Sequence, residues 1–98
     1  METKEITHTY RTSKNMSLRQ FAQQINQRLI NTDVSHSKVA RWESGKYEPE
    51  LDLLFECIAT YRSDWRAHWA VETIHSMYPD LVDSGMVTFH LPKAEQVQ

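Results

Sequence analysis

Hydrophobic residues recur along the chain at the spacing of an α-helix in five successive segments. The first segment spans residues 3–14, and the second follows Ser17, a favourable N-cap, and ends before a turn at residues 31–33. A third helix is predicted between Ser35 and Gly45, because serine caps helix N-termini and glycine commonly ends helices in the left-handed conformation.

Two further helices are predicted in the second half of the chain. Pro49 is expected at the first helical position of the fourth, a position that proline favours. The inward-facing residues of this helix are expected to be Leu51, Leu54, Phe55, Ile58 and Ala59. Ser63 should cap the fifth helix and Pro79 should end it, and residues 86–91 are a candidate strand. The pattern therefore predicts an all-α, five-helix chain with a short extended C-terminal tail.

Composition places the chain among ordinary soluble globular domains. Its 98 residues are 40% hydrophobic and 24% charged, which suits one domain with one core. No apolar run reaches eighteen residues and no apolar segment follows the N-terminus, so we expect no membrane span, no secretory signal and a cytoplasmic location. The single cysteine, Cys57, cannot form a disulfide framework and lies in an apolar helix, which predicts a packing role.

Charge is distributed unevenly along the chain. The net charge is −2, but residues 1–48 contain eight Lys or Arg and five Asp or Glu, whereas residues 49–98 contain three and eight. The first half is therefore positive and the second half is acidic. This asymmetry is typical of a module that turns one face toward a polyanion such as DNA.

The third helix separates into two faces at about 100° per residue. Val39 and Trp42 lie on one arc with Ser35 and form the natural core face. The opposite arc carries Ser37, Arg41 and Ser44, with Lys38 and Ala40 at its edges. Small flanking residues allow close approach to another surface, and arginine pairs bidentately with guanine. Together with the preceding helix, this arrangement indicates a helix-turn-helix, although a solvated face with one arginine gives the same pattern.

The motifs in this region resemble the Cro and phage-repressor type of helix-turn-helix, also called the xenobiotic-response-element family. Residues 16–22, Met-Ser-Leu-Arg-Gln-Phe-Ala, match the family pattern Leu-Ser-x-x-x-Leu-Ala. Residues 35–49 match Ser-x-x-x-Ile-Ser-x-Trp-Glu-x-Gly-Lys-x-x-Pro at most positions. The resemblance covers roughly residues 5–60, and its Trp-Glu-x-Gly-Lys-x-x-Pro portion is the specific part.

The resemblance implies roles for individual residues. The residues expected to read bases are His36, Ser37, Lys38 and Arg41. The residues expected to contact the DNA backbone are Ser17, Arg19, Ser44, Lys46 and Tyr47. They lie near helix ends, where backbone amides and cations meet phosphate. For Tyr47 a packing role is an equal alternative.

The resemblance also implies an ion pair between Arg11 and Glu43. The helical angle of Glu43 places it on the inward side beside Val39, and a buried carboxylate needs a partner. Arg11 stands where family members carry an arginine that pairs with this glutamate. The alternative is that Glu43 extends into water.

The chain departs from the family pattern at two places. Seven additional residues lie between Ile25 and Trp42, which we interpret as a longer second helix followed by the turn. Leu18 replaces the glutamine that family members frequently use to contact a phosphate. Arg19 and Arg28 are candidates to replace that contact.

The predicted function is a sequence-specific transcriptional regulator, more specifically a repressor, that binds double-stranded DNA as a homodimer. Residues 1–61 would form the DNA-binding core, and the fifth helix and tail in residues 62–98 would dimerise. The expected dimer residues are Trp65, Trp69, Ile74, Met77, Tyr78, Val87, Phe89 and Leu91. Alternatively, the aromatic residues close a monomeric core and the tail packs over it.

Two other classes of function compete with this prediction. An antitoxin, or another protein-interaction module, could use the same fold with a toxin or a second regulator as partner. The support for an enzyme is thin. His68, Glu72 and His75 share one helical face at a spacing that can bind a metal, but a charged face in contact with solvent explains the same three residues. We therefore expect no catalysis, cofactor or metal.

Overall fold

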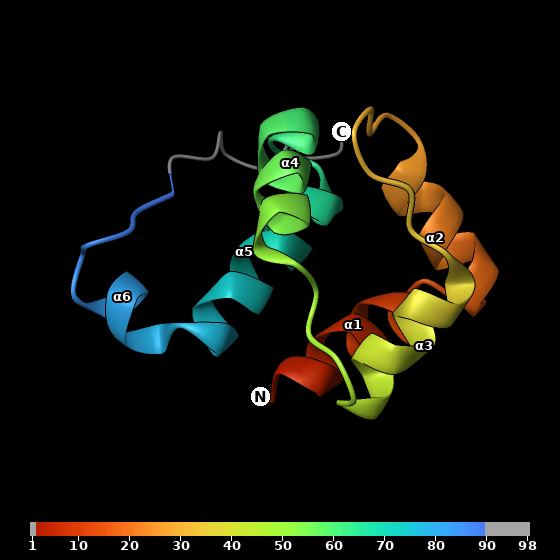
Figure 1. The fold of residues 1–98 in the computed structure, drawn as a ribbon, viewed down its shortest axis with the longest axis horizontal. Coiled ribbons are helices and arrows are strands. Elements are labelled where there is room, and N and C mark those ends of the chain that lie inside the picture. The colour runs from red at the N-terminus through yellow and green to blue at the C-terminus, as the bar shows by residue number, and fades with distance from the viewer. Residues whose placement is uncertain (1, 90–98) are drawn as a thin grey trace.

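The structure is a computed structural model that describes residues 2–89, which form six helices and no strand (Figure 1). The helices are α1 (Thr3–Ser13), α2 (Leu18–Asn26), α3 (His36–Ser44), α4 (Leu51–Tyr61), α5 (Trp65–Met77) and α6 (Pro79–Asp83). The all-α fold is confirmed. Helix α5 ends at Met77, just before Pro79, as predicted, but the short helix α6 that begins at Pro79 was not predicted; the fixed φ of proline suits this first helical position.

Trp69 of α5 occupies the centre of the core. Its side chain is fully buried, and its ring packs against Phe21 of α2 and Trp42 of α3 at centroid distances of 5.6 and 5.8 Å. Its indole N–H donates to the hydroxyl of Thr7 in α1 at 3.0 Å, so the polar atom is satisfied as burial requires. Helix α5 therefore shares one core with α1, α2 and α3.

Side chains set the helix starts, and two differ from expectation. The hydroxyls of Ser17 and Ser35 accept the backbone N–H three residues later at 3.1 Å, as predicted. Helix α5 is capped by Asp64 rather than Ser63, because the Asp64 carboxylate accepts the N–H of Arg66 and also pairs with its guanidinium. Helix α4 begins at Leu51, after a buried Pro49, instead of at the proline itself.

Helix α2 ends at Asn26, so the prediction of a longer second helix is wrong. The carbonyl oxygens of Gln24 and Ile25, which a longer helix would have used, accept hydrogen bonds from Arg66 at 2.8 Å and Tyr61 at 2.5 Å. Side chains of α4 and α5 thus take the acceptors that helix elongation needs. The additional residues lie in the loop 27–35.

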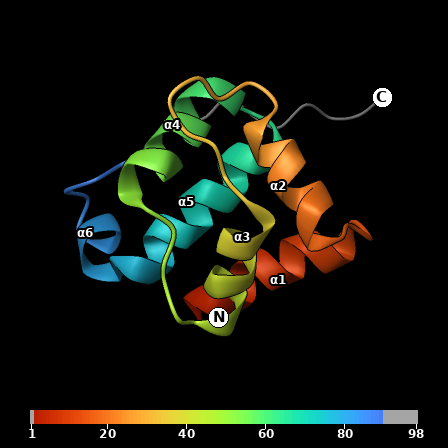
Figure 2. The ribbon, with the colours of Figure 1, turned by 45° about the vertical axis from the view of Figure 1, so that its right-hand side comes forward.

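Side chains of Asn26 and Glu56 hold the loop 27–35 by hydrogen bonds at its end and at its middle. The Asn26 amide brackets Val34, donating to its carbonyl and accepting its N–H, both at 2.7 Å. The Glu56 carboxylate accepts three hydrogen bonds, from the N–H groups of Ile30 (3.2 Å) and Asn31 (3.3 Å) and from the Thr32 hydroxyl (2.9 Å). Figure 2 shows the loop passing α4 before it descends to α3. These contacts tie the start of α3 to α4.

Helix α4 buries a face that overlaps the predicted one at Leu54 and, in part, at Ile58, whereas Ala59 is exposed. Its buried residues are Leu53, Leu54, Cys57 and Tyr61. Leu51 and Phe55 are instead 38% and 45% exposed. Apolar residues occur on almost every side of this helix, so periodicity could not select the buried face. The packing role of Cys57 is confirmed, because its side chain is fully buried.

The chain after α6 folds back without regular structure. Residues 86–89 form no strand, so that part of the strand prediction is wrong, and residues 90 and 91 lie outside the described residues. The N–H of Val87 donates to the carbonyl of Leu81 at 3.1 Å, and Phe89 packs against the core. None of the helices between residues 2 and 89 is both long and apolar enough to cross a membrane.

Candidate nucleic-acid interface

Helix α3 presents the two faces that its sequence predicts. Val39 and Trp42 are buried in the core, whereas Ser37, Arg41 and Ser44 are exposed on the other side. A single apolar stripe therefore fixes the rotation of α3 about its axis. We call Ser37, Arg41 and Ser44 the outer face of α3.

Arg41 stands at the middle of the outer face with its guanidinium free to reach outward. The guanidinium lies 5.9 Å from the ring centroid of Tyr47, which is 56% exposed. Within residues 2–89, no carboxylate pairs with Arg41. A cation that is steadied by an aromatic ring but unpaired with an acid remains available to a base or a phosphate.

Lys38 and His36 lie at the edge of the outer face, and both are half-buried. The ammonium of Lys38 lies 3.3 Å from the carboxylate of Glu50, just before α4. This contact turns Lys38 toward α4 and partly neutralises its charge. The structure thus gives Lys38 an acidic partner, whereas the sequence grouped it with Arg41.

Gly45 ends α3 in the left-handed conformation, with φ +79°. The N–H groups of Gly45 and Lys46 return to the carbonyls of Trp42 (3.2 Å) and Arg41 (3.1 Å), which satisfies the end of the helix. A Cβ at Gly45 would also meet Cδ of Lys4 at 3.1 Å. This turn leaves Lys46 and Tyr47 exposed beside the outer face, where a DNA backbone would pass.

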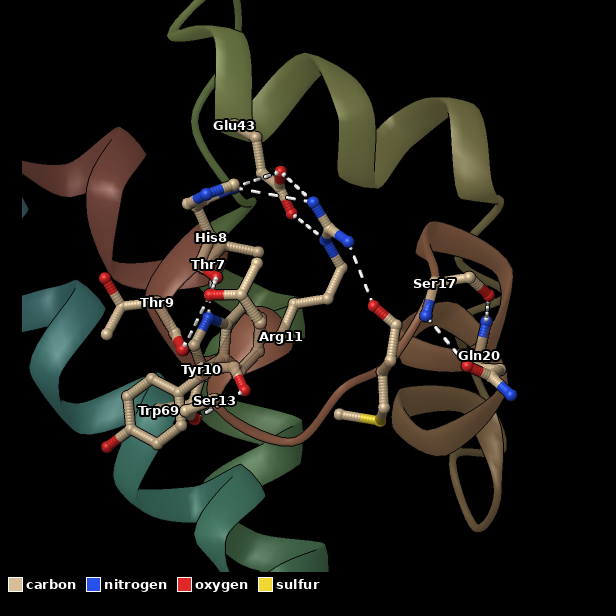
Figure 3. A network of polar contacts seen from close by, with 12 residues as sticks. Thr7, His8, Thr9, Tyr10, Arg11, Ser13, Ser17, Gln20, Glu43 and Trp69 are labelled. Carbon is tan, nitrogen blue, oxygen red and sulfur yellow. Dashed lines mark hydrogen bonds and ion pairs between the residues drawn. The ribbon is translucent and has the colours of Figure 1, made fainter.

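The N-terminus of α2 provides a second exposed end. The Ser17 hydroxyl and the Gln20 carboxamide cap each other's backbone N–H groups at 3.1 and 2.8 Å (Figure 3). Ser17 and Arg19 are exposed beside it. A helix N-terminus with an adjacent arginine is suited to phosphate through its backbone N–H groups and dipole.

Glu43 joins α3 to α1 in the network of Figure 3. The Arg11 guanidinium donates two hydrogen bonds to this carboxylate, from Nε at 2.6 Å and from Nη2 at 2.9 Å. Its third nitrogen, Nη1, donates to the carbonyl of Met16 at 2.9 Å. Because Met16 immediately precedes the cap of α2, one guanidinium links α1, the start of α2 and α3.

The ionisation of Glu43 reflects this environment. Burial by itself would raise the pKa of the Glu43 carboxyl, but hydrogen bonds from Arg11 and His8 hold that pKa below its ordinary value. The same hydrogen bond raises the pKa of Arg11. The predicted ion pair is present, with Glu43 only 12% exposed, so this carboxylate does not extend into water.

Sequence reasoning missed two contacts at this site. The ring of His8 lies with Nδ1 3.0 Å from the Glu43 carboxylate, and it occurs one helical turn before Arg11, a spacing that could have suggested a shared partner. The pairing of Lys38 with Glu50 had no signal, because these residues approach each other only through the turn at Gly45.

The alternative metal site does not assemble. The Tyr10 hydroxyl donates to Glu72, and the His75 ring lies 2.8 Å from the Asp83 carboxylate. Among residues 2–89, no group of three His, Cys, Asp or Glu side chains is arranged to hold a metal ion.

The expected dimer residues lie mostly in the protein's own core. Trp69 and Ile74 are buried, so the expectation that they contact a second chain is wrong. Trp65 stacks on Tyr10 at a centroid distance of 6.1 Å. Met77 and Phe89 pack against the core, Val87 is half-buried, and only Tyr78 is exposed, at 40%. Leu91 lies outside the described residues. Trp69 and Ile74 therefore pack within the core of the chain itself.

Comparison with known proteins agrees with this geometry. No curated protein and no solved structure gives a significant match to the chain. A family model described as helix-turn-helix matches residues 8–66, more than half of the chain, and spans all of α2, α3 and α4. With its capped α2, its outward-facing α3 and the ion pair that joins α3 to α1, the chain belongs to the Cro/C1-type helix-turn-helix family of DNA-binding transcription regulators.

Proposed function

We propose that the protein is a sequence-specific transcriptional repressor that binds a two-fold operator as a homodimer. The observation that carries the proposal is the outer face of α3, where Arg41 is exposed between two serines and its helix is fixed by the ion pair of Glu43. Occupying an operator blocks transcription without requiring a further contact, so repression is the simplest consequence of such binding.

Base reading is assigned to the outer face of α3. Small serine side chains let the helix backbone approach the floor of the major groove, and Arg41 is long enough to form two hydrogen bonds with guanine. Ser37 and His36 at the start of α3 are the next candidates, since the first residues of a reading helix contact base edges. Lys38 contributes less than expected because Glu50 offsets its charge.

Backbone contacts are assigned to the two ends that flank α3. Ser17 and Arg19 lie on one of them, and Lys46 and Tyr47 on the other. Phosphate contacts of this kind fix the register of a protein on DNA but carry no sequence information. A single α3 covers few base pairs, so a homodimer that reads two half-sites about one helical turn apart would supply the discrimination.

Selection of bound sequences from a random DNA pool tests the proposal. We expect an inverted repeat with its half-sites about 10 base pairs apart. Arg41→Ala should weaken binding to the selected site by roughly 1–3 kcal/mol and relax the preference at one position. Lys46→Ala, the matched control, should weaken all sequences alike and reduce the salt dependence. An equal, sequence-independent loss for both variants would contradict the assignment of roles, and a single unrepeated site would contradict the homodimer.

A protein-interaction role, such as that of an antitoxin, is the second candidate. The observation that favours it is the α6 region, where Tyr78, Leu81 and Met86 are 40%, 38% and 76% exposed. Exposed apolar groups of this size occur at protein interfaces. A protein that co-purifies in constant proportion, and whose removal abolishes DNA binding, would support this candidate over an autonomous repressor.

A further inference from the structure

The outer face of α4 is apolar and uncovered. Helix α4 packs mainly against α5, using the side that carries Leu53, Leu54 and Cys57 (Figure 1). On its other side Leu51 and Phe55 are 38% and 45% exposed, one helical turn apart. Because i, i+4 residues form a continuous ridge, these side chains make one apolar stripe on the surface. We call this stripe the α4 ridge; it continues through Ile58, which is half-buried, and Ala59, which is exposed.

The loop 27–35 exposes a further apolar side chain close to α4. The side chain of Ile30 is 89% exposed, yet its N–H is bonded to Glu56, the residue next to Phe55. Hydrogen bonds to Asn31 and Thr32 hold the same part of the loop against α4. Ordering the loop through Glu56 therefore keeps the Ile30 side chain in water close to α4. This placement costs free energy unless another surface covers it.

Charges of opposite sign stand at the two ends of the ridge. Glu48, Glu50 and Asp52 surround its first residue, Leu51, and all three acids are exposed. Arg62 follows its last turn, is exposed, and makes no ion pair with any residue between 2 and 89. Arg62 is the C-cap residue of α4, eleven residues after Leu51 and about 16 Å further along the helix axis.

We propose that the α4 ridge is the dimer interface, with α4 of a second copy packed against it in antiparallel orientation. A two-fold contact requires a surface that is complementary to itself. With the axis near the middle of the ridge, Phe55 of one copy meets Ile58 of the other. Arg62 of each copy then comes level with Leu51 of the other, one residue along the axis from Asp52. This inference rests on the proposed homodimer and names the surface that forms it.

The charges distinguish this surface from the other exposed apolar region. Around α6, Asp80 and Asp83 accompany Leu81 and Met86, and residues 67–89 contain no lysine or arginine. A two-fold contact there would bring carboxylates together with only His75, which already lies against Asp83, to balance them, and like charges across an interface oppose association. The α4 ridge carries both signs at opposite ends, so a second copy satisfies both.

Charge exchange between two variants tests the pairing. In sedimentation equilibrium, Asp52→Arg alone and Arg62→Asp alone should each raise the dimer dissociation constant at least roughly tenfold, because each homodimer then contains two like-charged contacts. An equimolar mixture should regain the wild-type dissociation constant to within about threefold, since both contacts of the mixed dimer are again complementary. Recovery in the mixture also shows that both variants are folded.

Two further variants complete the experiment. Phe55→Ser should weaken the dimer without changing affinity for a single DNA half-site, and Asp80→Arg on α6, the matched control, should leave dimerisation unchanged. Dimers that withstand Asp52→Arg and Phe55→Ser, a mixture that fails to recover, or a dimer weakened by Asp80→Arg would overturn the α4 ridge as the interface. Wild-type protein that stays monomeric both free and on the selected two-half-site DNA would instead contradict the homodimer itself.

Discussion

Glu43 in α3 and Glu56 in α4 each fix how α3 is held in the fold, Glu43 through α1 and Glu56 through the loop that precedes α3, and they use different partners. Glu43 is 12% exposed and binds the guanidinium of Arg11, so a charge meets a charge across two helices. Glu56 lies at the surface and accepts two backbone N–H groups and one hydroxyl from the loop 27–35. Burial would raise the pKa of both carboxyls, and the hydrogen bonds they receive hold both below the ordinary value.

The difference in partners means that the two carboxylates contribute differently to the free energy of unfolding. Removing the Glu43 carboxylate leaves the Arg11 cation half-enclosed between helices, where water replaces the lost partner poorly. Removing the Glu56 carboxylate leaves neutral amides of Ile30 and Asn31 at the surface, where water can bind them. The helix junction at Glu43 should therefore be the stronger of the two.

Glu43→Ala is the substitution expected to have the largest effect. It should lower the free energy of unfolding by about 3 kcal/mol, the lower end of the range for stranding one member of a buried pair. Urea unfolding followed by circular dichroism measures this loss. In a double-mutant cycle, Arg11→Ala should add little to Glu43→Ala. An unchanged unfolding midpoint for Glu43→Ala would mean that the pair contributes nothing.

Glu56→Ala should lower the free energy of unfolding by a smaller amount, about 1–2 kcal/mol, since three hydrogen bonds to one carboxylate are exchanged for bonds to water. The amide protons of Ile30 and Asn31 should exchange with solvent faster, while those of α5 keep their protection. Glu48→Ala, which removes another exposed carboxylate of the same region, is the matched control. Equal losses for Glu43→Ala and Glu56→Ala would remove the distinction between the two sites.

The response to acid should be the smallest and should appear at both sites. Because folding lowers the pKa of Glu43 and Glu56 below the unfolded value near 4.5, the folded state binds fewer protons in this range. Their contribution to stability is therefore complete above pH 4.5 and is lost as the pH falls through the folded pKa values. Melting temperatures between pH 7 and pH 3 should fall less steeply for Glu43→Gln and for Glu56→Gln than for the wild type. A wild-type melting temperature that rises below pH 4.5 would show the opposite sign of shift.

The contrast between these sites also explains what the sequence could predict. Helix α3 has one apolar stripe, so its buried face and the inward angle of Glu43 followed from spacing. The motif around Trp42 then identified the partner of Glu43. No comparable pattern marks Glu56, because a carboxylate that binds loop amides needs neither periodicity nor a fixed distance along the chain.

In the second half of the chain, the abundance of apolar residues made the prediction of buried and exposed positions unreliable. In α4, where apolar residues face nearly every direction, Phe55 was expected inside and is exposed. In α5, Trp69 was expected at an interface and is the centre of the core, joined to Thr7 by a hydrogen bond across 62 residues of sequence. Neither placement follows from local spacing, since the first depends on how α4 packs on α5 and the second on how α1 and α5 meet in space. The end of α2 likewise depends on Tyr61 and Arg66, which arrive from distant parts of the chain.

The burial of Cys57 makes its thiol a natural probe of local opening in the protein. Its thiol is enclosed between α4 and the core, and burial raises its pKa to about 12, so almost no reactive thiolate exists while the fold is closed. A thiol reagent can therefore label the chain only when α4 separates from the core. The rate of labelling therefore reports the local opening of α4, and the measurement requires no change to the sequence.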